Sequence, residues 1–468
     1  MNEATQKQLL ETLRENPGAR SAHKRDVVAN VRVSAGGYLA LAALLTFISV
    51  ILLRTNRDLA ALILVTATWI VIPLLMATDR LSFDGHTLFR TGLLPLFGRL
   101  GRRARPQLTV EQIERVEVAA VRTLRRGGSV RYRYRIEISG LGRNFVFASG
   151  GRKFREMVRA LLPGIIDEKL DARSRELRDY VCDPKELEQQ INDLGIAAPA
   201  VLESADDGRH RTENRFAPAV TAEEVHHAER LRQGANRLRV AGRLRESAEA
   251  FRRALHLSGE PWLLYEFARL LRSQASAFSD ARLLKRAGAA LKLSLQRSGD
   301  DARLAERIGE SFFEFGQPVR AAKAFRRAID IDPNAFRAYI GLAEIALSDG
   351  KLAHVIHHYR DAARVAPDAA TGRMARTEAE YYSRLNDDDD YLNSELRRMN
   401  WLESAGRVQQ FSARVSFASL FVALTGSFLD QIVAGVGWAV ASSSIIGWSG
   451  ALVVRKFLAQ RRGNNLNA

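Results

Sequence analysis

Three arginines alternate with two tyrosines in one segment of the chain, and this is its clearest candidate for binding an anion. Arg131, Arg133 and Arg135 lie in a stretch that alternates polar and apolar residues from 130 to 138. In a β-strand this alternation places the three guanidinium groups on one face. A phosphate-binding row and a solvated strand face both agree with the pattern. The basic loop at 96–105 adds Arg102 and Arg103, so we predict a lipid-facing basic surface here.

Residues that could hold a metal or act as a nucleophile are few. His354, His357 and His358 have a helical spacing that zinc accepts, but the sequence places no carboxylate or thiol to complete a site, and we interpret them as surface and packing residues. The single cysteine, Cys182, fits a reducing compartment and is interpreted as an incidental thiol. No phosphate loop, nucleophile elbow or metalloprotease pair occurs. We therefore expect no metal, no cofactor and no enzymatic activity.

The elements that position these residues include two apolar stretches more than three hundred residues apart. The first covers 33–53 and 59–77, and the second covers 415–429 and 432–454. About 20 apolar residues cross the hydrocarbon core of a bilayer as a helix. Two transmembrane helical hairpins are therefore predicted. For 415–429, which is short and contains Ser, Thr and Gly, a re-entrant or interfacial segment is the alternative.

The charge of the chain indicates which side of a membrane the rest occupies. The net charge is +17, and many cations flank the apolar stretches, whereas the break at Asp430 and Gln431 has none and the break at 54–58 has two. An excess of Lys and Arg in short flanks marks the cytoplasmic side. We expect a multi-pass protein of the bacterial inner membrane with both termini and the soluble domains in the cytoplasm. The cations also suit anionic lipid headgroups better than nucleic acid, which we do not expect as a partner.

Short strands follow the first hairpin. Strands are predicted at 80–85, 86–94, 113–121, 130–138 and 144–148, followed by an amphipathic helix at 153–162. Antiparallel strands closed by one helix, directly after a membrane hairpin, resemble the bacterial pleckstrin-homology-like (PH-like) domains. Residues 80–94 are similar to their opening hairpin and 108–117 to their third-strand entry. The resemblance implies binding of a lipid headgroup or a protein partner.

A repeat of 34 residues marks the second half of the chain. Gly316 and Gly350, Phe325 and Tyr359, and Pro333 and Pro367 are each 34 apart. This period with these residue types resembles the tetratricopeptide (TPR) repeat of paired helices. The resemblance covers four repeats over 228–369, with an insertion near 272–279, and it implies a protein or peptide partner on the concave face.

Two polar pairs occupy matching positions in these repeats. Arg232 and Asn236 are four residues apart, as are Arg303 and Arg307. Some tetratricopeptide domains clamp the carboxylates of an acidic chain terminus with such residues, and this resemblance implies the same role here. Ordinary solvated polar residues are the alternative, and Glu310 together with nearby glutamates favours a mixed or basic ligand. All five residues are predicted to line the partner-binding groove.

We therefore predict a multidomain membrane protein with two transmembrane hairpins, a small β-rich PH-like domain with a C-terminal helix, and an all-α TPR solenoid. Its function would be that of a scaffold or adaptor, and the alternatives are lipid sensing or handling and a subunit of an envelope-biogenesis or secretion complex. The expected divisions are a tail (1–32), hairpin 1 (33–78), the PH-like domain (79–168), a linker (169–219), the TPR domain (220–385), a connecting helix (386–412), hairpin 2 (413–454) and a basic tail (455–468).

Overall fold

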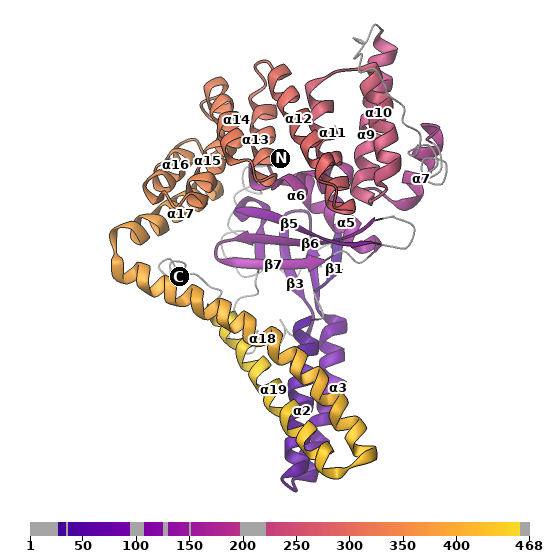
Figure 1. The fold of residues 1–468 in the computed structure, drawn as a ribbon, viewed down its shortest axis with the longest axis vertical. Coiled ribbons are helices and arrows are strands. Elements are labelled where there is room, and N and C mark those ends of the chain that lie inside the picture. The colour runs from indigo at the N-terminus through magenta and orange to yellow at the C-terminus, as the bar shows by residue number, and fades with distance from the viewer. Residues whose placement is uncertain are drawn as a thin grey trace, which may run out of the picture.

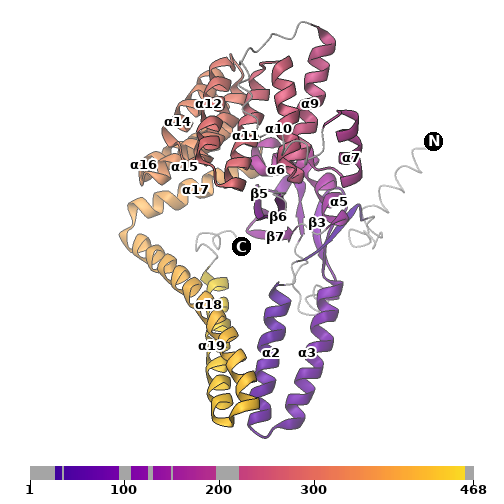
Figure 2. The same cartoon turned by 45° about the vertical axis from the view of Figure 1, so that its right-hand side comes forward.

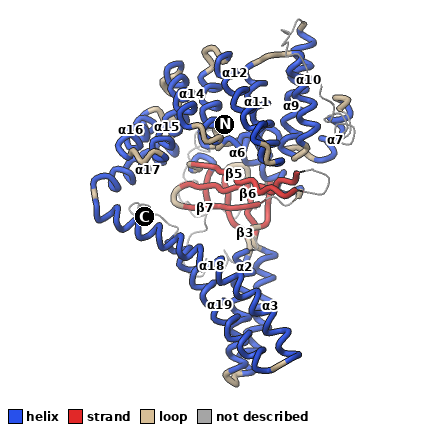
Figure 3. Tube along the Cα trace, in the orientation of Figure 1, coloured by secondary structure: helices blue, strands red, loops and turns tan. Residues whose placement is uncertain are grey.

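A computed structural model describes residues 27–33, 36–93, 107–124, 130–148, 151–196 and 221–458. A small domain of β-strands lies in the middle of the molecule, and a curved stack of helices arches over it (Figure 1). Two pairs of long helices extend from the opposite side and run close to each other (Figure 2). The strands are thus enclosed between two helical regions (Figure 3).

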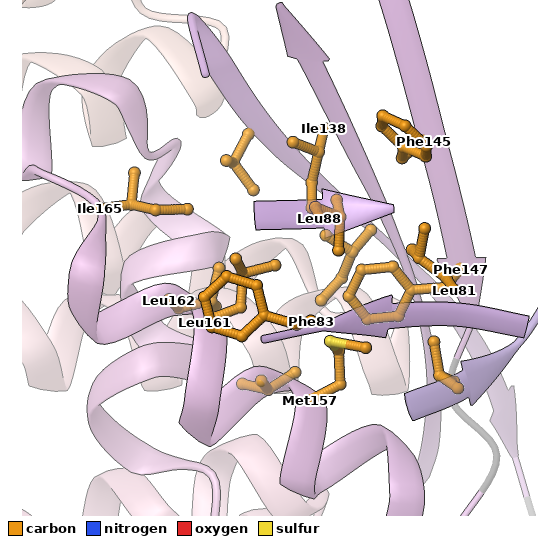
Figure 4. Close-up of a cluster of buried hydrophobic side chains, with 14 of the residues drawn as sticks. Leu81, Phe83, Leu88, Ile138, Phe145, Phe147, Met157, Leu161, Leu162 and Ile165 are labelled. Atoms are coloured by element: carbon orange, nitrogen blue, oxygen red, sulfur yellow. The ribbon is translucent and has the colours of Figure 1, made fainter. Parts of the chain in front are cut away.

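The strand domain consists of two antiparallel sheets and a closing helix. Sheet order is β1-β2-β3-β4 in one and β5-β6-β7 in the other. The strands are β1 (Ala29–Arg32), β2 (Arg80–Phe83), β3 (Thr87–Thr91), β4 (Gln107–Thr109), β5 (Arg115–Leu124), β6 (Val130–Gly140) and β7 (Arg143–Ala148), and the helix is α5 (Arg152–Leu161). Inward side chains of both sheets meet the apolar face of α5, where Leu81, Phe147 and Met157 are almost completely buried (Figure 4).

The first strand of this domain precedes the first pair of long helices. β1 pairs with β2, and Val31 lies opposite Leu81, so α2 (Gly36–Arg54) and α3 (Asp58–Thr78) are inserted between two neighbouring strands. The prediction that 1–32 is a tail is therefore wrong for its last residues. The strand is four residues long, too short for an alternation of polar and apolar residues to identify it.

A buried polar cluster joins the inserted helices to the sheet. The hydroxyl of Tyr38, in α2, donates a hydrogen bond to Asp79 Oδ2 at 2.5 Å, and Arg90 Nε, in β3, donates to Asp79 Oδ1 at 2.6 Å. Asp79 follows α3 directly and is 1% exposed. Both helices are thus held to the sheet through one carboxylate.

The helical stack is a solenoid of four helix pairs followed by a single helix. The pairs are α9 (Ala222–Ala241) with α10 (Leu244–Leu257), α11 (Pro261–Phe278) with α12 (Ala281–Arg297), α13 (Ala302–Glu314) with α14 (Pro318–Ile331) and α15 (Phe336–Ser348) with α16 (Leu352–Arg364), and α17 (Ala369–Asp387) follows. The turns inside three pairs contain Gly242, Gly316 and Gly350, all with positive φ. A residue with a side chain is strained in that conformation, which explains the recurrence of glycine.

The third and fourth pairs follow the predicted period of 34 residues. A Cβ built on Gly309 or Gly341 would lie 2.6 or 2.3 Å from the ring of Phe325, so the ring packs where only glycine leaves room. The predicted insertion near 272–279 lies at the end of α11, which has 18 residues where α13 and α15 have 13. The helical solenoid is thus present as predicted.

The segment that follows α5 packs into the solenoid and is not a free linker. It contains two short 3-10 turns, η2 (Leu162–Gly164) and η3 (Asp167–Lys169), and then α6 (Ala172–Tyr180) and α7 (Pro184–Asp193). The predicted linker at 169–219 is therefore wrong up to residue 196, and the residues from 197 to 220 lie outside those described. The segment is rich in charged residues, which normally indicates solvent, but here the charges pair with charges of the solenoid.

The long helices are mostly apolar. α18 (Asp389–Leu429) and α19 (Gln431–Leu458) form the second pair, and α18 joins the predicted connecting helix and the predicted span without a break. Among the described residues, three helices are long and apolar enough to cross a membrane, namely α3, α18 and α19, whereas the apolar part of α2 found by the same criteria is the shorter Leu41–Leu53. That the four helices cross a membrane stays a prediction.

Candidate functional site

The concave face of the solenoid contains a dense set of ion pairs, and its main occupant is α6. Glu176 of α6 contacts Arg269 Nε of α11 and lies 3.0 Å from Arg239 Nη1 of α9. Both arginines are less than 8% exposed. Because one carboxylate bridges two inner helices, α6 holds neighbouring repeats in a fixed relation.

A second group of pairs extends this contact to α13 and α15. Arg175 of α6 contacts Glu310, which also accepts a hydrogen bond of 2.7 Å from Arg337 Nη2. Asp167 of η3 contacts Arg303 and lies 2.9 Å from Arg307 Nη2. The inner helices of the four pairs are α9, α11, α13 and α15. The first three therefore bond directly to residues 167–176, and α15 bonds to Glu310, which contacts Arg175.

A third group surrounds Glu266, a buried carboxylate of α11. It accepts hydrogen bonds from Asn236 Nδ2 at 2.7 Å, from Arg232 Nη1 at 2.9 Å and from the hydroxyl of Tyr180 at 2.9 Å. Burial raises the pKa of Glu266, although the nearby charge of Arg232 opposes the rise. Glu266 thus neutralises Arg232 and engages Asn236, the first of the two predicted pairs.

The charges in the groove set the titration of its carboxylates. Burial acts to raise the pKa of Glu176, but Arg239 and Arg269 outweigh it and lower the pKa to about 2. The pKa of Glu310 falls to about 2 for the same reason, because Arg175 and Arg337 outweigh its burial. Each carboxylate is therefore held in its charged form by the contact with α6 and the inner helices.

One carboxylate in the groove behaves in the opposite way. Burial raises the pKa of Glu306 to about 7, and the negative charge of neighbouring Glu310 raises it further. Arg337 and Arg175 oppose this rise but already bond to Glu310. Glu306 is thus an acid that gains or loses a proton near neutral pH at the edge of the α6 contact.

All five predicted groove residues lie together on the concave face, but each is engaged within the chain. Arg232 and Asn236 bind Glu266, Arg303 and Arg307 bind Asp167, and Glu310 binds Arg175. The groove is therefore occupied from within the chain: Asp167 and Arg175, of the segment 167–180, contact Arg303, Arg307 and Glu310, whereas Glu266 of α11 contacts Arg232 and Asn236. Sequence analysis missed this segment, since its alternating charges resemble those of a solvated linker.

A hollow of about 280 Å³ remains beside α6. Arg307 lies over the indole ring of Trp262, with its guanidinium carbon 5.2 Å from the ring centre. Three acidic and four basic side chains line the hollow together with the two rings, namely Arg178, Asp179, Tyr180, Arg232, Glu260, Trp262, Glu266, Arg303 and Arg307. Most of these charges already pair with one another, so the hollow offers little net charge to a ligand.

The arginine row is present on the strand domain as predicted. Arg131, Arg133 and Arg135 all lie in β6 and are exposed, while Tyr132 and Tyr134 point to the other side, toward the solenoid, where Tyr134 donates a hydrogen bond of 2.8 Å to Val240 O. Arg135 lines a pocket at the free edge of β7. The two predicted cations of the basic loop, Arg102 and Arg103, lie outside the described residues.

Three other candidates have local explanations. His357, His358 and Asp361 bring possible ligand atoms within 4.8 Å of one another, but Asp361 is also paired with Arg364. The sequence analysis overlooked Asp361, which is four residues after His357. Burial raises the pKa of the Cys182 thiol, which disfavours the reactive thiolate. In the run of aspartates at 387–390, Asp388 caps α18 by accepting a hydrogen bond of 2.9 Å from the amide of Tyr391.

Comparison with known proteins gives little. No model of a known family matches the chain, and no curated protein is significantly similar to it. Among solved structures, the crystal structure of MamA is similar over 40% of this chain and 95% of its own, with 13% sequence identity and a TM-score of 0.27. At this level of similarity no function can be transferred from MamA.

Proposed function

We propose that this protein is a scaffold anchored in the bacterial inner membrane by α2, α3, α18 and α19. The 21 residues of α3 span about 31 Å, which matches a hydrocarbon core. Large apolar side chains cover the outside of the helices, including Leu59 at 76% and Phe428 at 90% exposed. An apolar surface this continuous is stable in lipid and invites aggregation in water.

Charges at the helix ends support a cytoplasmic soluble part. Arg398, Arg407 and Arg455 lie toward the ends of α18 and α19 that face the strand domain, whereas the turn between these helices contains Asp430 and no cation. Lys and Arg are retained on the cytoplasmic side of short flanks. The other tip carries Arg54 and Arg57, so the second pair of helices supplies the stronger argument.

The strand domain in this proposal is a PH-like domain. Two antiparallel sheets, of four and three strands, are closed by α5, which supports the proposal, although β1 precedes the first pair of long helices and the resemblance implied strands only after it. The solenoid is fixed to this domain through α6 and through direct contacts such as Tyr134 with Val240. The soluble part would therefore move as one unit, at a set distance from the membrane.

One observation carries the proposed scaffold role: unpaired cations gather on the outer helices α12 and α14. Seven exposed cations there make no ion pair within the described part of the chain, namely Arg282, Lys285, Arg286, Lys292, Arg320, Lys323 and Arg326. Asp330 is the one acidic residue of the two helices. Uncompensated charge of one sign attracts and steers a partner of the opposite sign. An acidic protein surface is the partner that fits.

The membrane does not account for these cations. α12 and α14 lie at the end of the molecule opposite the tips of the long helices (Figure 1). Electrostatic attraction in physiological salt decays over about 8 Å. The cations on these helices therefore act on something in the cytoplasm, and they mark the outer face of the solenoid, not its filled groove, as the docking surface.

The test is a charge reversal on the outer face of the full-length protein. We expect Lys285→Glu with Lys323→Glu to lose an acidic partner from detergent-solubilised complexes, and 0.5 M salt to weaken the wild-type complex by at least about tenfold. Arg384→Glu with Arg397→Glu, on exposed positions of α17 and α18, is the matched control. Undiminished recovery by the outer-face variant, or recovery of nucleic acid in place of protein, would contradict the proposal.

A further inference from the structure

Three histidines and one aspartate form a stripe along one face of α16, the outer helix of the fourth pair. His354, His357, His358 and Asp361 have the spacing i, i+3, i+4 and i+7, which places their side chains on the same side of a helix. From the sequence, no carboxylate was placed to complete a metal site with the histidines. The structure supplies one, because possible ligand atoms of His357, His358 and Asp361 lie within 4.8 Å of one another.

The contact between His357 and Asp361 already has the separation that a metal ion requires. Nε2 of His357 lies 3.3 Å from Oδ2 of Asp361. Bonds of about 2.0–2.2 Å to a tetrahedral zinc ion place two ligand atoms about 3.3 Å apart. The rings of His357 and His358 are adjacent, with their centres 5.5 Å apart. The side chain of His357 is 66% exposed, so a small rotation of its ring can bring all three ligand atoms around one ion.

An ion pair explains only part of this cluster. A protonated His357 would bond to Asp361 without a metal, but Nδ1 of His358 is buried and has no hydrogen-bond partner among the described residues. Buried polar atoms are normally paired. Burial lowers the pKa of His358 and the neighbouring His357 lowers it further, although Asp361 opposes the fall. The neutral imidazole is thus favoured, and this is the form that binds metals.

Two arginines compete with a metal ion for this place, but neither blocks it. Arg364 bonds to Oδ1 of Asp361, whereas Oδ2 is the oxygen next to His357. The Arg364 side chain is 76% exposed and can turn into the solvent. Arg326 of α14 adds positive charge near His358. A hard cation such as Ca²⁺ or Mg²⁺ would find one carboxylate among these cations, whereas imidazole nitrogens are good ligands of Zn²⁺, Cu²⁺ and Ni²⁺.

We propose that His357, His358 and Asp361 bind a divalent transition metal of the zinc class. Three protein ligands leave the fourth tetrahedral position to a water molecule. All three ligands belong to one helical turn and its continuation, so the ion would stabilise α16 and add positive charge to the outer face of the solenoid beside Arg326. The inference depends neither on the proposed membrane anchoring nor on the proposed acidic partner.

The experiment uses full-length protein purified in detergent through a tag without histidine, stripped of metal with a chelator and titrated with Zn²⁺ alone by calorimetry. We expect one Zn²⁺ per chain. His357→Ala and Asp361→Asn should each weaken binding at least about tenfold, because each removes a ligand. His354→Ala is the matched control on the same helix face and should keep the affinity. Arg364→Ala should tighten binding, because it removes a competing cation.

Thermal unfolding of each variant without metal verifies that it is folded. Zn²⁺ binding that survives both His357→Ala and Asp361→Asn would overturn the site. An equal loss in His354→Ala would do the same, because it would indicate general adsorption to exposed histidines. Displacement of Zn²⁺ by an equal concentration of Mg²⁺ or Ca²⁺ would refute the assignment to a transition metal.

Discussion

Glu176 is the residue whose removal should most directly release the solenoid from α6. The side chain is 17% exposed and bridges Arg239 and Arg269, which are themselves buried. Glu176→Gln keeps the shape of the side chain but removes its charge. Two buried guanidinium groups would then face a neutral amide, and burying a cation without a counter-charge is costly.

The size of the effect follows from the titration of the carboxylate. A fall of the pKa from 4.5 to about 2 means that the groove favours the charged form of Glu176 over the neutral form by about 3 kcal/mol. Breaking a buried ion pair by removing one partner costs about 3–5 kcal/mol in other proteins. We therefore expect Glu176→Gln to lower the free energy of unfolding of the soluble part by about 3 kcal/mol.

The measurement combines denaturant unfolding of the full-length protein in detergent with hydrogen exchange along α6. Exchange of the α6 amides should accelerate by about a hundredfold, the factor that corresponds to about 3 kcal/mol. Glu156→Gln is the matched control, because Glu156 pairs with Arg152 in an exposed bridge and its loss should cost under about 1 kcal/mol. If Glu176→Gln is no more destabilising than Glu156→Gln, the groove contact does not hold the solenoid in the way described.

Three further predictions concern other parts of the molecule. Asp79→Asn should lower stability by about 1–3 kcal/mol and be non-additive with Arg90→Leu, because both remove the same bonds between sheet and helices; additive losses in thermal unfolding would count against this. Raising the pH from about 4.5 to about 7 should lower the free energy of unfolding of wild type by at most about 3 kcal/mol, because the raised pKa of Glu306 favours the protonated folded state. Glu306→Gln should flatten this pH dependence. Parallel pH profiles of the two proteins in denaturant unfolding would contradict this prediction. Gly437→Ala should cost about 1–3 kcal/mol in detergent, because a Cβ there would lie 2.6 Å from the backbone of α18, whereas Gly435→Ala, with open space at the same distance, should leave the unfolding temperature unchanged.

Local patterns predicted much of the architecture. The recurrence of Gly316 and Gly350 identified the repeat, and both glycines lie in turns with positive φ in the structure. The amphipathic stretch at 153–162 identified α5 within one residue at each end. Such features depend on neighbours in sequence, so the sequence expresses them directly. β1 escaped prediction because a four-residue strand is recognised only by its pairing with β2, on the far side of two long helices.

The candidate site shows the same division. Sequence analysis correctly grouped Arg232, Asn236, Arg303, Arg307 and Glu310 on one face of the solenoid, because helical spacing and the repeat determine which side chains share a face. It did not predict that Asp167 and Arg175 would contact Arg303, Arg307 and Glu310, since ion pairs between residues more than sixty positions apart leave no periodic signal.

The order of charges and apolar runs along the chain thus established helices, repeats and membrane-compatible segments, each of which arises from short-range geometry. Which charges remain available to other molecules was decided only when the chain folded. Pairing within the chain neutralises the groove, and it leaves the cations of α12 and α14 exposed. A charge that is compensated by its own chain has little left to offer a partner.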